Sequence, residues 1–171
     1  MHGSTRRAVG KIWPSRLNLP KTRLSGSRTS YNDPNMTLGM EFHDARLLDL
    51  ICRSDGSGHE LFHACIYRSE GVVFIDPQES GWQNCRLTFQ GMRVEGTSVE
   101  PGEYSSGGSL WVDGKIHDDV VLLPLDHDGA IQVHLVMSPL FETLKIHAEK
   151  VSSTLEGPWE LERVWSLEEM T

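Results

Sequence analysis

The sequence predicts an all-β protein, an antiparallel sandwich or partly open barrel of about 8 to 10 strands with a disordered N-terminal tail. Three observations predict it. From Met40 onward, short apolar stretches alternate with turn residues at intervals of about ten residues. Several stretches alternate apolar and polar side chains with the two-residue period of a strand. Only one segment offers helical spacing, and its flanks read as strands.

The first elements follow Met40. Residues 42–53 are predicted to form a strand, and DGSG at 55–58 a turn, because glycine accepts positive φ and aspartate bonds its own backbone. Residues 59–67 alternate as the next strand. Their predicted inward side chains are Phe62, Ala64 and Ile66.

The middle of the chain continues the pattern. GVVFI at 71–75 is a short apolar run that Asp76-Pro77 ends. Residues 85–96 are predicted to be a strand with a bulge at Gly91. That strand would group Leu87 and Phe89 with Met92 and Val94.

The later elements are a hairpin and three further strands. Residues 109–117 form the hairpin, with Asp113-Gly114 at its bend. VVLLPL at 120–125 is a strand, DHDG at 126–129 a turn, and 130–137 a strand. The inward residues of the last are predicted to be Ile131, Val133, Leu135 and Met137. A final strand would place Trp159, Leu161 and Trp165 on one face.

Residues 138–151 support two interpretations. Ser138 could cap a helix with Pro139 in its first turn, and Leu140, Leu144, Ala148 and Val151 have helical spacing. A strand would instead bury Leu144, Ile146 and Ala148. The helix leaves Ile146 exposed, so we favour a strand preceded by a turn at 138–142.

The first 36 residues differ from the rest and are predicted to be a disordered basic tail, with the single β-domain at 37–171. Residues 1–35 hold seven Lys or Arg and one acid, a net +6, whereas the remainder holds nine against 23, a net −14. The tail could be a basic arm, a transit peptide or sequence upstream of a true start at Met36 or Met40; we favour the last. The acidic body argues against nucleic-acid binding and fits a basic protein partner.

Sequence composition also indicates the cellular compartment of the protein. No apolar run approaches the ~18 residues that span a bilayer, and no apolar segment follows the N-terminal basic residues as in a signal peptide. Cys52, Cys65 and Cys85 form no C-x-x-C pair, so we expect reduced, buried thiols in a cytoplasmic protein.

Polar clusters provide the candidate chemistry. His43-Asp44 and His117-Asp118-Asp119 are the residues to test as metal ligands or catalysts. His59 and His63 would share a strand face at about 13 Å, too far apart for one metal ion. We therefore expect that no catalytic, metal or cofactor site forms.

One aromatic residue is singled out as a partner contact. Trp82 lies between Gly81 and Gln83 in a predicted loop, where an indole is free to bind a partner.

The order of features from Phe42 onward resembles a loose class of small bacterial all-β domains of undefined function. The segments that carry the resemblance are FHDARLLDL, LTFQGMRVE, GKIHDD, IQVHL, LKIHAEKVSSTLEG and WELERVW. Several such domains are immunity or other accessory proteins. The resemblance covers about residues 41–165, implies an all-β fold without a defined active site, and supplies no functional residues.

The sequence is compatible with two functions. The first is a non-enzymatic interaction domain whose acidic surface binds a partner, since complementary charge speeds and orients association. An immunity-type protein is one concrete version. The alternative is a metal-dependent or small-ligand-binding enzyme that uses His and Asp residues at strand ends and loops. The sequence does not define the oligomeric state.

Overall fold

A computed structural model describes residues 36–71 and 79–165, all within one compact unit, Asn32–Thr171. The predicted tail, apart from Met36, and the predicted strand at 71–75, apart from Gly71, lie outside the described residues.

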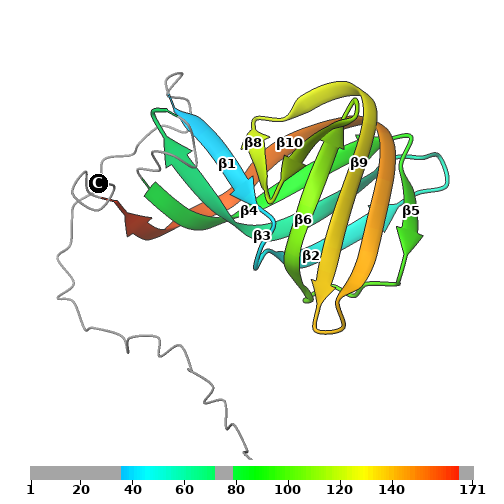
Figure 1. Cartoon of the computed structure of the whole chain (residues 1–171), viewed down its shortest axis with the longest axis horizontal. Helices are drawn as coiled ribbons and strands as arrows, with labels where there is room; N and C mark the ends of the chain where they lie inside the picture. Colours follow the sequence, from blue (N-terminus) through cyan, green and yellow to red (C-terminus); the bar gives the residue numbers. More distant parts are fainter. Residues whose placement is uncertain (1–35, 72–78, 166–171) are drawn as a thin grey trace, which may run out of the picture. The chain divides into compact units, whose positions relative to one another are not determined.

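Ten strands make up the described fold (Figure 1). They are β1 (Thr37–Glu41), β2 (Arg46–Cys52), β3 (Gly58–Ser69), β4 (Glu79–Gln90), β5 (Arg93–Gly96), β6 (Tyr104–Val112), β7 (Lys115–Asp118), β8 (Val120–Leu123), β9 (Asp126–Ser138) and β10 (Glu142–Val164). No helix occurs in the described ranges, and every strand pairing is antiparallel. The predicted all-β fold is confirmed.

Six strands form a ring in the order β2-β6-β9-β10-β4-β3, which the β3–β2 pairing closes. The seam between β2 and β6 is short, with Arg46 opposite Tyr104 as its one register pair. Strands β1 and β8 extend the sheet beyond the second half of β3, while β5 pairs with β10 and β7 with β6. The result is a partly open barrel, with an open sheet made by β8, β1, β3, β4 and β10.

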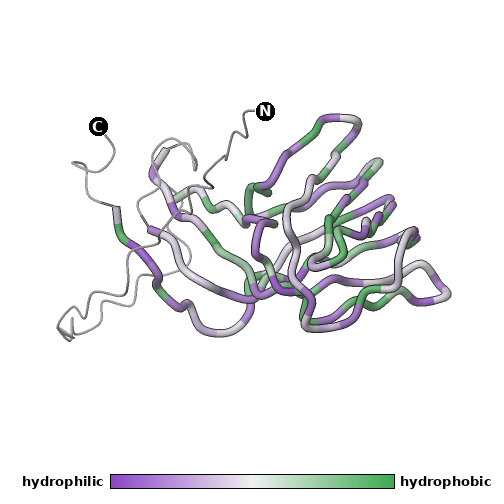
Figure 2. Tube along the Cα trace, turned by 60° about the horizontal axis from the view of Figure 1, so that its bottom comes forward, coloured by the Kyte–Doolittle hydropathy of each residue, from purple (hydrophilic) through white to green (hydrophobic). Residues whose placement is uncertain are grey.

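The core lies inside the ring and continues under the open sheet. Side chains on alternate positions supply it, so hydropathy changes repeatedly along the strands (Figure 2). Its largest fully buried members include Phe42, Phe62, Phe89, Leu87, Leu110 and Leu135. Phe42 and Phe62 meet edge to face, with ring centroids 6.1 Å apart.

The segment with two interpretations is a strand. Residues 139–141 form a turn and β10 begins at Glu142, pairing with β9 and so burying Leu144, Ile146 and Ala148 as the strand interpretation predicted. In β9, Ile131, Val133, Leu135 and Met137 are buried, as the two-residue period predicted. Pairing on both sides of β10 therefore decides against the helix.

Several local predictions were wrong. The predicted single strand at 85–96 is divided at Gly91, where a bend and not a bulge separates β4, which ends at Gln90, from β5, which begins at Arg93. Residues 42–45 are not part of a strand: His43 and Asp44 form a turn, and β2 begins only at Arg46. Residues 126–129 are not a turn either, because β9 already begins at Asp126 and Pro124 and Leu125 make the connection. Val94, expected inward, is 37% exposed on the edge strand β5.

Candidate interaction surface and surface groove

The first candidate pair, His43 and Asp44, lies on the turn between β1 and β2. Nδ1 of His43 is 3.2 Å from Oδ2 of Asp44, and both side chains are mostly exposed. Asp44 has a positive φ of 61°, which its short polar side chain tolerates, and its backbone N–H donates to Ser105 O at 2.8 Å. The pair therefore has an evident role in shaping the turn.

The second candidate group, His117, Asp118 and Asp119, lies at the end of β7. Asp119 joins β7 to β8 with a positive φ of 56°, and its carbonyl oxygen accepts the N–H of Phe42 at 2.8 Å. This bond makes the two candidate segments neighbours in space. Their side chains nevertheless do not converge: within the described ranges, no three His, Cys, Asp or Glu side chains form a group that could hold a metal ion.

The remaining histidines of the opening hairpin bind separate partners. Nε2 of His59 donates to Oδ2 of Asp49 at 2.9 Å, and Nδ1 of His63 donates to Oδ1 of Asn84 at 3.0 Å. Both histidines lie on β3, as predicted, and each uses one ring nitrogen to bond a side chain of a neighbouring strand, β2 for His59 and β4 for His63. These imidazoles link strands.

Trp82 does not lie in a loop. It belongs to β4, opposite Cys65 of β3, and is partly buried. Its indole stacks on the His63 ring, with centroids 5.6 Å apart and planes inclined by 22°. The flanking Gly81 is required by packing, since a Cβ there would lie 2.7 Å from Trp159 Cζ2. Gly81 is therefore explained by the packing of Trp159 against it, and not by a turn of the chain at this position.

Acidic and aromatic side chains share with Trp82 the sheet face opposite the core. We call Glu41, Tyr67, Trp82, Glu160 and Glu162 the acidic aromatic face. The Tyr67 hydroxyl donates to Glu41 at 2.7 Å, and the Ser80 hydroxyl donates to Glu162 at 3.5 Å. Glu160 lies opposite Trp82 in the β4–β10 pairing. In the part of the chain that the structure describes, none of these three carboxylates forms a salt bridge.

Two of the three thiols are buried and are poor nucleophiles, whereas Cys52 is exposed, contrary to the expectation. Burial, with Glu162 nearby, raises the pKa of Cys65 to about 12, and burial raises the pKa of Cys85 to about 12 as well. Burial and the bond to Glu41 also raise the pKa of Tyr67. These groups therefore stay protonated near neutral pH and act as hydrogen-bond donors.

The turn between β9 and β10 carries an apolar tip that sequence reasoning missed. Leu140 and Phe141 are 74% and 71% exposed, the highest values among the described large hydrophobic residues. Phe141 also has a positive φ of 56°, which is unusual for an aromatic residue. The sequence predicted a turn that begins at Ser138 and Pro139, but no residue pattern showed that the apolar side chains of this turn would project outward.

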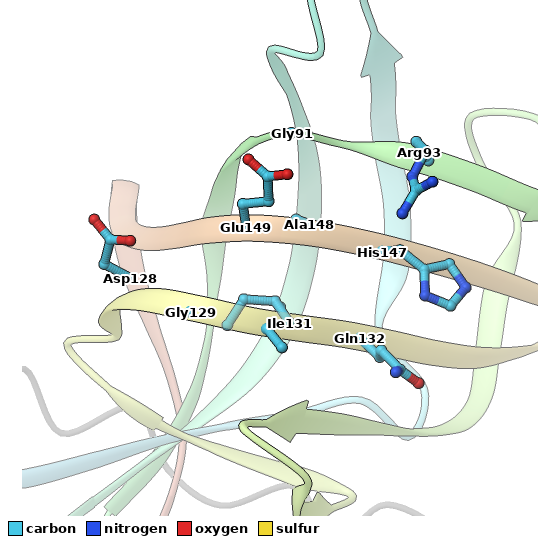
Figure 3. A pocket seen from close by; sticks show the side chains of 10 residues that line it. Gly91, Arg93, Asp128, Gly129, Ile131, Gln132, His147, Ala148 and Glu149 are labelled. Atoms are coloured by element: carbon cyan, nitrogen blue, oxygen red, sulfur yellow. The ribbon is translucent and has the colours of Figure 1, made fainter.

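A groove of about 450 Å³ lies on the outer side of β9 and β10 (Figure 3). Arg93, Gln132 and His147 line one end, and Asp128 and Glu149 line the other. Nε2 of His147 is buried without a hydrogen bond, and Oε2 of Glu95 at 3.6 Å is too distant to provide one. Among the charged residues that line the groove, Arg93 is the cation at one end, and Asp128 and Glu149 are the anions at the other.

One acid faces the barrel interior. Glu60 is 0% exposed, and neither carboxylate oxygen has a hydrogen-bond partner among the described residues. Desolvation raises its pKa from 4.5 to about 8. The alternating pattern of β3 predicts an inward position for residue 60, but the acidic residue type conceals it.

Comparison of the chain with models of protein families, with curated proteins and with solved structures finds no match in any of the three. The described ranges also contain no helix long and apolar enough to cross a membrane.

Proposed function

We propose that this protein is a non-enzymatic interaction domain whose acidic surface binds a basic partner protein. An immunity-type role, in which the domain masks a basic toxin, is the concrete version. The observation that carries the proposal is the acidic aromatic face, where three carboxylates and Trp82 share one side of the sheet and none of the carboxylates forms a salt bridge in the described ranges.

The charge of the body supports a basic partner. Residues 36–171 carry a net charge of −14, so the domain attracts cationic surfaces from a distance. Glu41 and Glu162 accept hydrogen bonds from neutral hydroxyl groups, which fix the carboxylates without cancelling their charge. Lysine or arginine side chains of a partner would supply the missing countercharge.

Trp82 supports a specific contact. Stacking on His63 fixes its ring, so binding costs little side-chain entropy. A fixed indole beside carboxylates suits a lysine or arginine, because a cation can lie over the ring while its charge meets Glu160 or Glu162. Tryptophan is also enriched among residues that dominate binding energy.

The test uses a basic protein encoded by a gene adjacent to this one, titrated against the full chain by calorimetry at low and high salt. We expect binding that weakens with salt, and an affinity at least tenfold lower for Trp82→Ala. Glu41→Gln/Glu160→Gln/Glu162→Gln should slow association and remove most of the salt dependence.

Trp111→Ala, on β6, is the matched control and should bind as the native chain does. Thermal melts establish that each variant is folded. Binding that none of the substitutions alters would refute the role of this face, and the absence of binding to any adjacent basic product would refute the immunity version.

The alternative, an enzyme using His43, Asp44, His117, Asp118 or Asp119, has support from one observation only. The bond from Phe42 to Asp119 places the two segments side by side. Metal analysis of the purified protein separates the two proposals. Stoichiometric zinc, manganese or iron that is lost in His43→Ala or His117→Ala would favour the enzyme.

A further inference from the structure

The surface groove owes its space to small residues and to an irregular strand. Gly91, Gly129, Ala130 and Ala148 are among its lining residues. Between Ile131 and Asp128, β9 takes three steps while β10 takes two, from Ala148 to Lys150. This β-bulge interrupts the regular pairing at the groove, and bulges are common beside binding sites.

The bulge is held from outside the groove. The Ala130 N–H donates to Oδ1 of Asp113 at 3.0 Å, and Nε2 of His127 donates to Oδ2 of the same aspartate at 2.8 Å. A side chain at position 129 would collide with this pair, because a Cβ there would lie 2.6 Å from Oδ1 of Asp113. The groove is therefore preformed by contacts that a ligand need not provide.

Opposite charges occupy the two ends of the groove. Strand register places Arg93 and Gln132 on either side of His147, in one row across β5, β10 and β9. Figure 3 shows the Arg93 guanidinium directed toward His147 at this end, and the carboxylates of Asp128 and Glu149 at the other. Arg93 has no salt-bridge partner in the described ranges, and the Asp128–Lys150 pair is long, at 3.9 Å.

The separation of the charges selects a ligand length. His147 and Glu149 lie two residues apart on the same face of β10, so their rows are about 7 Å apart. Two residues of extended peptide also span about 7 Å. A single α-amino acid would not reach from one row to the other.

We propose that this groove binds a small zwitterion of dipeptide length. The ligand's carboxylate accepts hydrogen bonds from Arg93 and Gln132, and its ammonium group donates to Glu149. The ligand lies along the groove over the small residues Gly129, Ala130 and Ala148. The site is separate from the acidic aromatic face and does not depend on the proposed function.

The experiment is an NMR titration of the full chain, labelled with ¹⁵N, with alanyl-alanine. We expect amide shifts confined to the groove, at Gly91, Gly129, Ala130 and Ala148, with a millimolar dissociation constant, since both charge contacts are open to solvent. Acetylation of the ligand's amine, or amidation of its carboxylate, should each weaken binding about fivefold to tenfold.

Two variants assign each charge to its end of the groove. Arg93→Gln should bind the dipeptide and its C-terminal amide equally, and Glu149→Gln should bind the dipeptide and its N-acetyl form equally. Arg53→Gln and Glu100→Gln, both exposed, are the matched controls and should bind as the native chain does. The NMR spectrum of each variant also reports whether it is folded.

The length of the ligand gives a third comparison. Free alanine should bind at least fivefold more weakly than alanyl-alanine, because it reaches only one row. An ω-amino acid with the same distance between its charges tests whether the peptide group is recognised. If it binds as tightly as alanyl-alanine, the groove recognises only the spacing of the charges. If it binds more weakly, the groove also recognises the peptide. No groove shifts at tens of millimolar ligand, or equal binding of the blocked dipeptides by the native chain, would overturn the proposal.

Discussion

The buried carboxyl group of Glu60 makes stability depend on pH. Glu60 lies between Leu50 of β2 and Leu87 of β4, and its oxygens have no hydrogen-bond partner among the described residues. An ionised carboxylate there would lose its hydration without compensation, so the folded protein keeps the group protonated. Replacement by glutamine retains shape and neutrality but removes the titration.

The size of the effect follows from the two pKa values. Burial raises the pKa of Glu60 from 4.5 to about 8. Between these values the folded state binds a proton that the unfolded state releases, so the stability from this group is complete below pH 4.5 and falls as pH rises. Each pH unit costs about 1.4 kcal/mol, and the whole interval about 5 kcal/mol, a large share of the stability of a typical domain.

The assay is urea unfolding of the native chain and of Glu60→Gln between pH 5 and pH 8.5, followed by tryptophan fluorescence. The difference between the two free energies isolates residue 60 from the other titrating groups. We expect the free energy of unfolding of Glu60→Gln to rise relative to that of the native chain by about 1.4 kcal/mol per pH unit. This rise should end above pH 8. Unsatisfied amide hydrogens should cost it about 1–3 kcal/mol at every pH.

Parallel curves for the two proteins would refute this reasoning, because they would mean that Glu60 has the same proton affinity folded and unfolded. Glu100→Gln, an exposed carboxylate, is the control and should run parallel to the native chain. If Glu60→Gln lost stability relative to the native chain as pH rises, the sign would be contradicted, and a cation or donor stabilising the ionised group would be indicated.

Three further outcomes test the architecture. Phe62→Ala should destabilise the fold by about 3–5 kcal/mol in urea unfolding, because its ring fills the barrel core beside Phe42; an effect below about 1 kcal/mol would contradict that packing. Asp113→Ala should cost about 1–3 kcal/mol, since it removes the acceptor for Ala130 and His127, whereas Asp118→Ala, on an exposed carboxylate, should be nearly neutral. A thiol reagent near neutral pH should modify Cys52, which is exposed, before Cys65 and Cys85, whose pKa values burial raises to about 12; mass spectrometry would show the order, and early labelling of Cys85 would contradict its burial.

The fold was predictable because a two-residue period is a direct consequence of strand geometry. Ile131, Val133, Leu135 and Met137 had to share a face if residues 130–137 formed a strand, and they are all buried. Turn composition alone was less reliable. Residues 126–129 have turn chemistry but begin β9, because pairing with β10 stabilises the extended backbone there.

The candidate sites were harder to predict, since they depend on which strands are neighbours. No spacing in the sequence shows that Arg93 and Gln132 both lie beside His147, because the β5–β10 and β9–β10 registers create that row. The glycine beside Trp82 predicts a loop, but Gly81 makes room for Trp159 within a sheet. Residue type was misleading at two further places: Glu60 is a charged residue type at a buried position, and Leu140 and Phe141 are apolar residues at exposed positions.

The alternation that builds the core also separates folding from recognition along a single strand. On β10, Leu144, Ile146 and Ala148 are buried, while the outward groove residue His147 lies between Ile146 and Ala148, and Glu149 follows Ala148. Substitutions on the outer positions can therefore change charge and ligand preference while the inner row stays packed. Because the inner positions of the described strands form the hydrophobic core, we expect binding to evolve on outer surfaces, whose register the core already fixes.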